Sequence, residues 1–332
     1  SINNDSIPDL VVTAPTRKTD TISPGAAYIY YGSNGFASQA ACGAGCQELL
    51  PADVASTGQF GLDAAGGGNV GDVAGEAKPD LIIGQGNSSG GRAVLYFGTA
   101  SAATISTATS IEFRYTGTSS NRLGDTVKII ADMNNDGLSE VAFGLPNYNG
   151  GLANQGAVVI YYGRSQADWL TLYSGGFIPV PTGADDMIVG PNPLLEAAGN
   201  RFGRNTSGLV SLTDMNSDGV PELAVPMSIS AINQYRIFSG VDVVASTVAA
   251  PLEAASYALN LTQATTTDTN NTNGFGAAAV ASVDIVDSTA HDLVVSYPLV
   301  GYLQLYSGVT IGTTGPVQTI AGPASMGERV SG

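Results

Sequence analysis

The sequence is poor in the residues on which most catalytic sites depend. Its 332 residues include a single histidine, two cysteines and one tryptophan. A Ser-His-Asp site would therefore depend on His291, which stands at a loop-to-strand position that Pro8, Pro79 and Pro221 occupy elsewhere in the chain. We expect His291 to be a structural substitution there. We accordingly predict no catalytic residues and a protein that is not an enzyme.

Basic residues are scarce as well. Lysine and arginine number 12 against 28 aspartates and glutamates, which leaves a net charge of −16 at pH 7. This charge argues against nucleic acid or an anionic membrane as the main partner, because both would repel the chain. It favours cations as ligands instead.

Long hydrophobic runs are absent. No apolar stretch approaches the roughly 20 residues that a helix needs to cross a bilayer. The first ten residues, SINNDSIPDL, have neither the basic region nor the apolar region of a signal peptide. We therefore expect no direct insertion into a membrane, and a soluble, mature or excised domain.

The two cysteines, Cys42 and Cys46, lie in the short sequence CGAGC. No histidine is near enough in the sequence to complete a zinc site. We favour a small surface disulfide over two free thiols. A disulfide indicates an oxidising, extracellular or cell-surface setting.

The abundant residues indicate an all-β fold. The chain has 43 glycines and 16 prolines, together with many Val, Ala, Thr and Tyr residues. This composition is typical of short strands joined by tight turns, and we expect very little helix. The length would allow two average domains, although all-β folds of this size are often one unit.

Three sequence elements recur five times in a fixed order, which indicates a repeat architecture. An alternating aromatic and aliphatic run ends in glycine at Gly32, Gly98, Gly163, Gly240 and Gly308. An apolar run follows an acidic turn at 8–15, 79–85, 139–146, 221–226 and 291–298. A short motif precedes each full acidic turn or the C-terminus, as GQFG (58–61), NRLG (121–124), NRFG (200–203), NGFG (273–276) and ASMG (324–327). The apolar runs predict short strands closed by Gly or Pro.

Two of the acidic turns have the oxygen spacing of a calcium-binding loop. Such a loop offers side-chain oxygens at positions 1, 3 and 5, a sharp bend at position 6, a carbonyl at position 7 and a carboxylate at position 9. The first complete loop has Asp132, Asn134, Asp136, the carbonyl of Leu138 and Glu140, and the second has Asp214, Asn216, Asp218, the carbonyl of Val220 and Glu222. A strand follows each loop, unlike the helix of an EF-hand. One isolated copy could equally be a polar turn, but two copies at matching places predict two Ca²⁺ sites.

The acidic loop at 1–9 matches the pattern in part. The residues that fit are Asn3, Asp5, Ile7 through its carbonyl, and Asp9. Ser1 stands at the first position, and Ser6 stands where glycine is expected. Calcium binding and a metal-free turn both stay open for this third loop.

The remaining two acidic loops match less well. At 72–80, Asp72, Glu76 and Asp80 fit, but Ala74 offers no side-chain oxygen, so we expect weak binding or none. At 284–292, Asp284 and Asp292 are separated by Val286 and Ser288, so we predict an empty loop held by hydrogen bonds from side chains to the backbone.

The order of Phe-Gly, an acidic D-x-N-x-D-G loop and a strand ending near Gly-Ala-Pro resembles the FG-GAP repeat of integrin α-subunit β-propellers and of related bacterial and fungal proteins. The resemblance covers essentially the whole chain. It implies one β-propeller domain over 1–332, in which each repeat forms a four-stranded blade and the loop between its first two strands can bind calcium on one rim. It also implies that Phe60, Phe202 and Phe275 pack between blades.

Five repeats predict five blades, whereas members of that family usually have seven. The chain starts within a repeat, at NNDSIPD, and its last residues, ASMGERVSG, correspond to the corner and first strand of a repeat without its loop. Joined, the two ends would complete a fifth blade and close the ring. A part of a larger ring, or further blades whose sequences have drifted, are the alternatives. We interpret the long segments 164–199 and 241–272 as outer strands with extended loops.

The resemblance implies a non-catalytic, calcium-stabilised extracellular domain for cell adhesion or recognition. Its partner would be a protein or glycan ligand on a cell surface or matrix, and the domain would be a monomeric part of a larger surface protein. One alternative is a lectin-like accessory module or catalytic domain of a secreted carbohydrate-active enzyme, with the two long segments shaping a cleft. Another is a structural spacer.

Two further groups of residues bear on these alternatives. Trp169, Tyr173 and Phe177 could form a platform for sugar stacking, although an outer-strand anchor packed onto a neighbouring blade is the simpler interpretation. A glycosidase needs two carboxylates across a cleft. Asp185, Asp186 and Glu196 are available, but nothing in the sequence pairs them.

Overall fold

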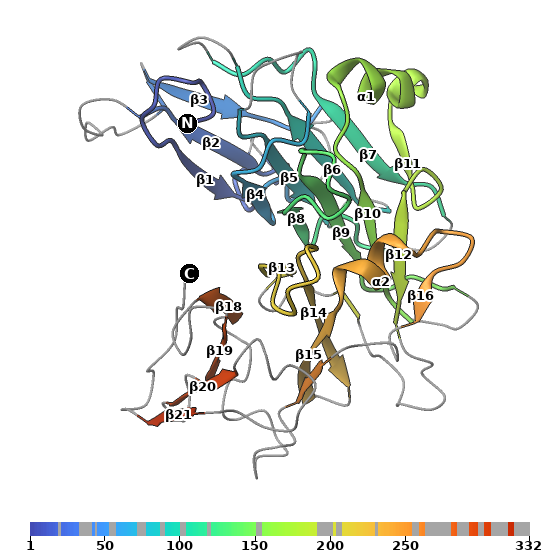
Figure 1. Ribbon diagram of the computed structural model, residues 1–332. Coiled ribbons are helices and arrows are strands. Elements are labelled where there is room, and N and C mark those ends of the chain that lie inside the picture. The colour runs from blue at the N-terminus through green and yellow to red at the C-terminus, as the bar shows by residue number, and fades with distance from the viewer. Residues whose placement is uncertain are drawn as a thin grey trace. The chain divides into compact units, whose positions relative to one another are not determined.

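Each of the five repeats folds into a β-sheet whose strands are mainly consecutive along the chain (Figure 1). The structure is a computed structural model. The residues that it describes are 1–18, 21–32, 42–43, 45–52, 58–71, 78–86, 90–99, 104–117, 121–150, 155–190, 202–203, 208–229, 232–253, 259–262, 280–283, 292–297, 302–306 and 318–321.

The first two sheets come from the first two repeats. The first has the order β1-β2-β3, with antiparallel pairing of β1 (Leu10–Ala14), β2 (Ala26–Tyr30) and β3 (Cys46–Leu49). The second has the order β11-β7-β6-β5-β4, formed by β4 (Ala64–Gly66), β5 (Leu81–Gln85), β6 (Arg92–Tyr96), β7 (Ile111–Tyr115) and β11 (Ile178–Val180).

The other three sheets follow the same plan. The third has the order β16-β12-β10-β9-β8, formed by β8 (Val127–Ile130), β9 (Glu140–Leu145), β10 (Ala157–Tyr161), β12 (Asp186–Val189) and β16 (Leu252–Glu253). The fourth has the order β13-β14-β15-β17, formed by β13 (Val210–Ser211), β14 (Leu223–Ile229), β15 (Ile232–Phe238) and β17 (Leu259–Thr262). The fifth has the order β18-β19-β20-β21, formed by β18 (Val280–Val283), β19 (Asp292–Tyr297), β20 (Tyr302–Tyr306) and β21 (Gln318–Ala321).

The predicted strands are confirmed. The apolar runs after the acidic turns form β1, β5, β9, β14 and β19, and the aromatic runs form β2, β6, β10, β15 and β20. The pairs β1–β2, β5–β6, β14–β15 and β19–β20 are antiparallel. In β5 and β6, for example, Leu81 lies opposite Tyr96 and Gln85 opposite Arg92. Short β-rich segments closed by turns form hairpins of this kind through local contacts alone.

The long segments 164–199 and 241–272 contain more than the predicted outer strands. After β10 the chain forms the helix α1 (Gln166–Leu172) and the 3₁₀ turn η1 (Tyr173–Gly175), and after β15 it forms the helix α2 (Gly240–Val244). Each segment then adds a strand in parallel to the sheet of the preceding repeat: β11 pairs with β7, and β16 pairs with β12. Only afterwards does it supply the outer strand of its own sheet, β12 or β17. These short parallel pairings have no signal in the sequence.

The Phe-Gly motifs pack against the preceding repeat, as predicted for Phe60 and Phe202. Phe60 bridges to Gly25, and Phe202 bridges to Gly156. Both rings are fully buried. A Cβ on Gly25 would lie 2.2 Å from the carbonyl oxygen of Phe60, so the close approach of the two backbones requires glycine. Phe275 lies outside the described residues.

Contacts divide the chain into two compact units. The first comprises Ser1–Ile130, Gly137–Leu145 and Ile160–Asp185, and the second comprises Ala131–Asp136, Pro146–Val159 and Asp186–Gly332. Each unit has its own hydrophobic cluster, with Phe60 and Leu81 in the first and Met215 and Tyr235 in the second. Among the described residues, no helix has the length and apolar character that crossing a membrane would require.

Candidate metal sites in the acidic loops

The acidic loops share an unusual backbone conformation. In the loop at 1–9, positions 4 and 6 have positive φ, at Asn4 (56°) and Ser6 (65°). The same two positions have positive φ in the other loops, at Asn135 (60°) and Gly137 (88°), and at Ser217 (62°) and Gly219 (90°). A Cβ added to Gly137 or Gly219 would meet nothing within 4 Å, so the left-handed φ is the reason for glycine there. The three loops are therefore one motif despite their different residues.

A common hydrogen bond fixes the first half of this motif. The backbone N–H at position 5 donates to the side-chain oxygen at position 1: Asp5 to Ser1 (3.0 Å), Asp136 to Asp132 (3.2 Å) and Asp218 to Asp214 (3.2 Å). The N–H of Asp136 and Asp218 also donates to the amide oxygen of Asn134 (3.1 Å) and Asn216 (2.9 Å). Positions 1, 3 and 5 thus converge, as the spacing predicted.

The closing carboxylate at position 9 has a structural role that the sequence did not reveal. In the first loop, Asp9 accepts hydrogen bonds from the backbone N–H groups of Ile2 (2.7 Å) and Gly32 (2.7 Å). Gly32 is the corner glycine of this repeat, that is, the glycine that ends its aromatic run. Asp80 makes the equivalent pair of bonds, to Val70 (2.7 Å) and Gly98 (2.9 Å). The carboxylate therefore links the loop to the glycine that follows the aromatic strand of the same repeat, β2 or β6.

This pattern corrects the boundaries of the second loop. We predicted it at 72–80, with Asp72, Ala74 and Glu76 at the ligand positions. Val70, however, occupies the place of Ile2. The Val70 N–H donates to the closing aspartate, as the Ile2 N–H does in the first loop. The Val70 carbonyl accepts the N–H of Arg164 (2.9 Å), and the Ile2 carbonyl likewise accepts the N–H of Thr99 (2.8 Å). The loop thus begins at Asn69 and is three residues longer, so a count back from Asp80 gave the wrong register. Asp72, Ala74 and Glu76 lie outside the described residues.

The same bonds connect neighbouring repeats. Thr99 and Arg164 each follow the corner glycine of the next repeat, and each donates its N–H to the second residue of the preceding loop. The corner glycines fit tightly there, because a Cβ on Gly98 or Gly163 would lie 3.1 Å from the same carbonyl oxygen. A change in the conformation of either loop would therefore disturb its hydrogen bond to the next repeat.

The loop at 214–222 brings three carboxylates together. Asp214, Asp218 and Glu222 each offer an oxygen, and these oxygens lie within 4.8 Å of one another. Further bonds hold the loop closed: Gly219 N–H donates to Asp214 (2.8 Å), and Val220 N–H donates to Asp218 (2.9 Å). Three carboxylates and the Asn216 amide form an oxygen-only donor set, which suits a hard cation such as Ca²⁺.

Glu222 is the distinctive residue of this group. It is 3% exposed, and its Oε2 atom accepts the N–H of Met215 (2.6 Å), in the manner of Asp9 and Asp80. Its Oε1 atom is buried and has no hydrogen-bond partner among the described residues. Burial raises the pKa of Glu222 to about 7; the Met215 bond opposes this rise, and the charges of Asp218 and Asp214 add to it. A buried, charged carboxylate oxygen without a partner is unfavourable, so we expect this oxygen to bind a proton or a cation.

The loop at 132–140 crosses from one unit to the other between Asp136 and Gly137, so its two halves are described separately. In the first half, the amide of Asn134 also donates to Asp136 (2.9 Å). In the second half, Glu140 is fully buried at the start of β9. The backbone of the loop matches that of 214–222. Calcium binding here, including the carbonyl of Leu138, stays a prediction, as does the carbonyl of Val220 in the other loop.

The loop at 1–9 is closed by its own side chains. The Ser1 hydroxyl lies 2.9 Å from oxygens of both Asn3 and Asp5, and the Asn3 amide donates to Asp5 (3.1 Å). Asp5 also accepts the N–H of Ile7 (2.8 Å), and this bond is the main reason why its pKa is lowered. Hydrogen bonds thus satisfy the polar groups that a cation would otherwise bind. In the fifth loop, Asp284, Val286 and Ser288 lie outside the described residues, and Asp292 is fully buried.

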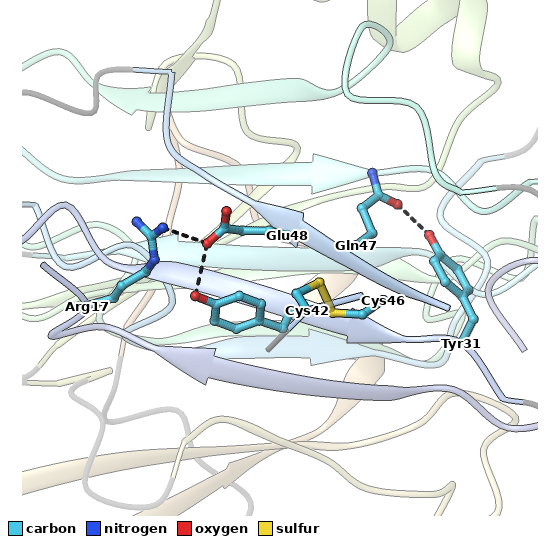
Figure 2. The surroundings of a disulfide bond; sticks show 7 residues. Arg17, Tyr31, Cys42, Cys46, Gln47 and Glu48 are labelled. Carbon is cyan, nitrogen blue, oxygen red and sulfur yellow. Dashed lines mark hydrogen bonds and ion pairs between the residues drawn. A yellow bond between two sulfur atoms is a disulfide. The ribbon is translucent and has the colours of Figure 1, made fainter. Parts of the chain in front are cut away.

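Cys42 and Cys46 form the predicted disulfide (Figure 2). Cys46 is the first residue of β3, and Gln47 follows it. The Gln47 side chain accepts a hydrogen bond from the Tyr31 hydroxyl and donates one to the carbonyl of Ile105 (2.9 Å). The disulfide therefore fixes the beginning of a strand whose polar side chains hold a neighbouring loop.

Trp169 is an internal anchor and cannot serve as a sugar-stacking platform. It is fully buried on α1, and its indole N–H donates to the carbonyl of Val70 (3.2 Å). The ring stacks edge-on against Phe113 (5.7 Å between centroids), and the guanidinium of Arg164 lies over it (4.9 Å). The anchor interpretation is thus correct, although the residue stands on a helix and not on the expected outer strand.

The candidate carboxylates of a glycosidase are not assembled in the described residues. Asp185 accepts the N–H of Tyr162 (2.7 Å) and pairs with Arg164. Asp186 is buried in β12, and Glu196 lies outside the described residues.

Comparison with known proteins gives a match among solved structures alone. No family model and no curated protein matches the sequence. Among solved structures, the chain is similar to one described as the structure of the Dos1 propeller, with a TM-score of 0.44 and 11% identity over 90% of this chain and 54% of that one. The chain therefore spans about half the length of that structure.

Proposed function

We propose that this chain is a non-catalytic β-propeller domain that is stabilised by Ca²⁺ and recognises a ligand outside the cell. The observation that carries the proposal is the group formed by Asp214, Asp218 and Glu222, with its buried Glu222 oxygen. The proposal has two further parts: the five sheets form one ring, and this ring recognises a ligand.

Calcium is the ion that the donor set favours. All side-chain donors are oxygens, and Ca²⁺ can complete its six to eight ligands with water and backbone carbonyls. Zinc prefers nitrogen and sulfur ligands. Like charges about 4 Å apart repel by roughly 1 to 4 kcal/mol in wet surroundings. A divalent cation would remove this repulsion within the loop.

The bound ion would stabilise the fold by mass action. The loop joins β13 to β14, and its ligands converge only when this hairpin is formed. An ion that binds the folded loop and hardly the unfolded chain contributes about 2.7 kcal/mol when its concentration is 100 times its Kd. The loop at 132–140 would supply the second site.

The five sheets would form the blades of one ring. A propeller requires repeated sheets of consecutive antiparallel strands, each packed against the next. Here the Phe-Gly motifs contribute to that packing. Within the described residues, β1 is an edge strand of a three-stranded sheet, and it leaves Leu10 (49%) and Val12 (41%) exposed. The segment ASMGERVSG, which has the pattern of a corner and first strand, would supply the fourth strand there. Deletion of 324–332 should then lower the melting temperature, and an unchanged melt would contradict closure.

The recognition role rests on the resemblance to integrin-type repeats and on the disulfide. A disulfide in a chain of this kind suits an oxidising compartment. In such a setting, rim loops held rigid by calcium would present a fixed surface to a protein or glycan of a cell surface or matrix. The domain would work as a monomeric part of a larger surface protein.

The decisive experiment is a calcium titration of the purified chain. Calorimetry and thermal melts, with calcium or with a chelator, should show binding and a higher melting temperature in calcium. Asp218→Asn should weaken the response, whereas Asp168→Asn on α1, an exposed carboxylate outside the acidic loops, should leave it unchanged. A melting temperature that is the same over a wide calcium range would refute the metal part of the proposal. Binding to cells and glycan arrays tests the recognition part separately.

A further inference from the structure

A polar cavity of about 480 Å³ lies within the first unit. Three repeats contribute to its lining: the first through Glu48 on β3, the second through Arg92, Tyr96 and Glu112 on β6 and β7, and the third through Tyr173 in η1. The cavity contains none of the residues of the acidic loops. Its volume lies in the range of about 300 to 1,000 Å³ that is usual for small-molecule sites.

One lining residue of this cavity, Arg92, stands directly opposite a second arginine. In the antiparallel pair of β6 and β7, Arg92 is the cross-strand partner of Arg114, and Val94 is the partner of Glu112. Like charges placed opposite each other across two strands repel, so this arrangement costs stability unless anions offset it. Glu112 is two residues from Arg114 on the same face of the sheet and supplies one such anion.

Glu112 cannot satisfy both arginines equally. Arg114 takes both of its oxygens, with Nε 2.6 Å from Oε1 and Nη2 3.0 Å from Oε2. Arg92 is left with a contact of 3.6 Å between Nη1 and Oε1, which is too long for a good hydrogen bond. The Arg92 side chain is 18% exposed. Its planar set of donors is therefore available to a second carboxylate.

The other acidic residue of the cavity does not compete for Arg92. Glu48 accepts a hydrogen bond from the Tyr28 hydroxyl (2.9 Å) and pairs with Arg17 (2.9 Å), whose guanidinium is directed at it (Figure 2). Arg17 and Arg114 lie outside the cavity lining and neutralise its two glutamates, Glu48 and Glu112. Together with Arg92, the ion-paired group has a charge of 3 − 2 = +1. This positive excess occurs in a chain whose net charge is −16.

The remaining lining suits the hydroxyl groups and ring of a sugar. Burial, together with the charge of Glu112, raises the pKa of both Tyr96 and Tyr173, so both phenols stay protonated at neutral pH. The Tyr173 ring, with Val94 and Leu50, provides apolar surface against which the C–H face of a pyranose can pack, whereas Tyr96 is 3% exposed and offers little surface. The carboxylates and the Ser110 hydroxyl can exchange hydrogen bonds with sugar hydroxyls.

We propose that this cavity binds a sugar that carries a carboxylate, with Arg92 as the residue that pairs with the carboxylate. The sugar ring packs against Tyr173, and Glu48 accepts hydrogen bonds from its hydroxyl groups. The disulfide contributes indirectly, because Cys46 begins the strand that carries Glu48. The site deepens the proposed recognition role by naming a ligand class, but it does not depend on calcium.

The test is a titration of the whole chain with three small probes: glucuronate, glucose and acetate. Glucuronate combines the ring with the carboxylate, glucose lacks the charge, and acetate lacks the ring. In buffered calcium we expect glucuronate to bind with a Kd of about 1 mM or lower, and the other two at least about tenfold more weakly. A repeat in chelator separates the two proposals, because loss of calcium binding should not abolish sugar binding.

Variants locate the site. Arg92→Gln should weaken glucuronate binding by about tenfold or more, whereas Arg92→Lys should have a smaller effect because it keeps the charge but loses the planar fork. Lys128→Gln on β8 removes one positive charge outside the cavity lining and should leave binding unchanged. A melt of each variant reports its folding. If Arg92→Gln does not fold, the preference of the unmodified chain for glucuronate over glucose and acetate decides alone. Equal binding of glucuronate and glucose, equal binding by a folded Arg92→Gln variant, or no binding up to about 10 mM would overturn the proposal.

Discussion

The loops at 1–9 and 214–222 have the same backbone and different chemistry. Both place positions 4 and 6 at positive φ, and both donate the N–H of position 5 to the side chain of position 1. In the first loop, hydrogen bonds among Ser1, Asn3 and Asp5 fill the interior. In the other, Asp214, Asp218 and Glu222 converge without such bonds between their carboxylates, which can only accept.

The residue at position 9 shows how one motif serves two purposes. Asp9 is short, and its two oxygens bond one backbone N–H each, from Ile2 and from the corner glycine Gly32. Glu222 is one methylene longer; it keeps the bond to the loop and leaves its other oxygen buried. Asp9 and Asp80 therefore close their loops through both oxygens, whereas Glu222 keeps one oxygen for a cation. Both loops that are complete in the sequence end in glutamate, at Glu140 and Glu222.

The largest effect is expected from removing the free oxygen. Glu222→Gln should remove the calcium-dependent stability that the 214–222 loop supplies, about 2.7 kcal/mol at a calcium concentration of 100 times the Kd, because the amide carries no charge. Thermal melts in calcium and in chelator measure this part. Asp9→Asn is the matched control and should leave the calcium response intact. A calcium response in Glu222→Gln that equals the response of the unmodified chain would show that the 214–222 loop does not hold the ion.

Asp9→Asn itself should lower stability to the same extent with and without calcium. The substituted side chain turns an NH₂ group towards one of two backbone N–H donors, so that one bond is lost and a donor is left without an acceptor. The expected loss is about 1 to 3 kcal/mol, measured by urea denaturation in calcium and in chelator. A loss that calcium reverses would mean that the first loop also binds the ion.

The two loops should respond to pH in opposite directions. Because the pKa of Glu222 is raised to about 7 in the folded, calcium-free chain, the folded state binds this proton more tightly than the unfolded state does. Its contribution is present at low pH and is lost as pH rises from about 4.5 to 7, by roughly 1 to 2 kcal/mol. The pKa of Asp5 is lowered, so its contribution is lost as pH falls.

Urea denaturation in chelator across this pH range tests the assignment. The difference between the unmodified chain and Glu222→Gln isolates the glutamate from other carboxylates whose pKa burial raises, such as Asp63 and Asp125. Parallel pH profiles for the two proteins would show that Glu222 is not responsible.

The smallest effect concerns position 6. Ser6 has φ of 65°, which favours glycine, and Gly219 has φ of 90° at the same place. Ser6→Gly should therefore raise the free energy of unfolding by about 0.5 to 1 kcal/mol, and Gly219→Ser should lower it by a similar amount. Chemical denaturation in chelator measures both. Shifts of the same sign in the two variants would show that the loops do not share this conformation.

Local features of the fold could be predicted from the sequence. The strands, the Cys42–Cys46 disulfide and the buried Phe60 and Phe202 depend on neighbours within one repeat or the next, and each has a recognisable pattern. The ligand spacing of the acidic loops is equally local, which is why the three carboxylates of 214–222 could be identified.

Other features could not be predicted, because they join segments far apart in the chain. The start of the second loop at Asn69 shows only in the bond from Val70 to Asp80, since the extra residues between them shift a count made along the sequence. For Trp169 the sequence favoured a packed anchor, but it placed this anchor on an outer strand and did not show its contact with Val70. Its position on a short helix, like the parallel pairing of β11 with β7, follows from packing against a preceding repeat.

The sequence by itself determined the number of repeats, the all-β character and the positions of the acidic loops, because short strands, turns and ligand spacing depend on residues that are close together in the sequence. The tertiary structure alone decided what each carboxylate and arginine does. Asp9 and Glu222 stand at the same position of the same motif, yet backbone N–H groups satisfy both oxygens of the first and one of the second. Arg92 became a candidate ligand-binding residue only when the sheet set it opposite Arg114, since a charge is available or neutralised according to its neighbours in space.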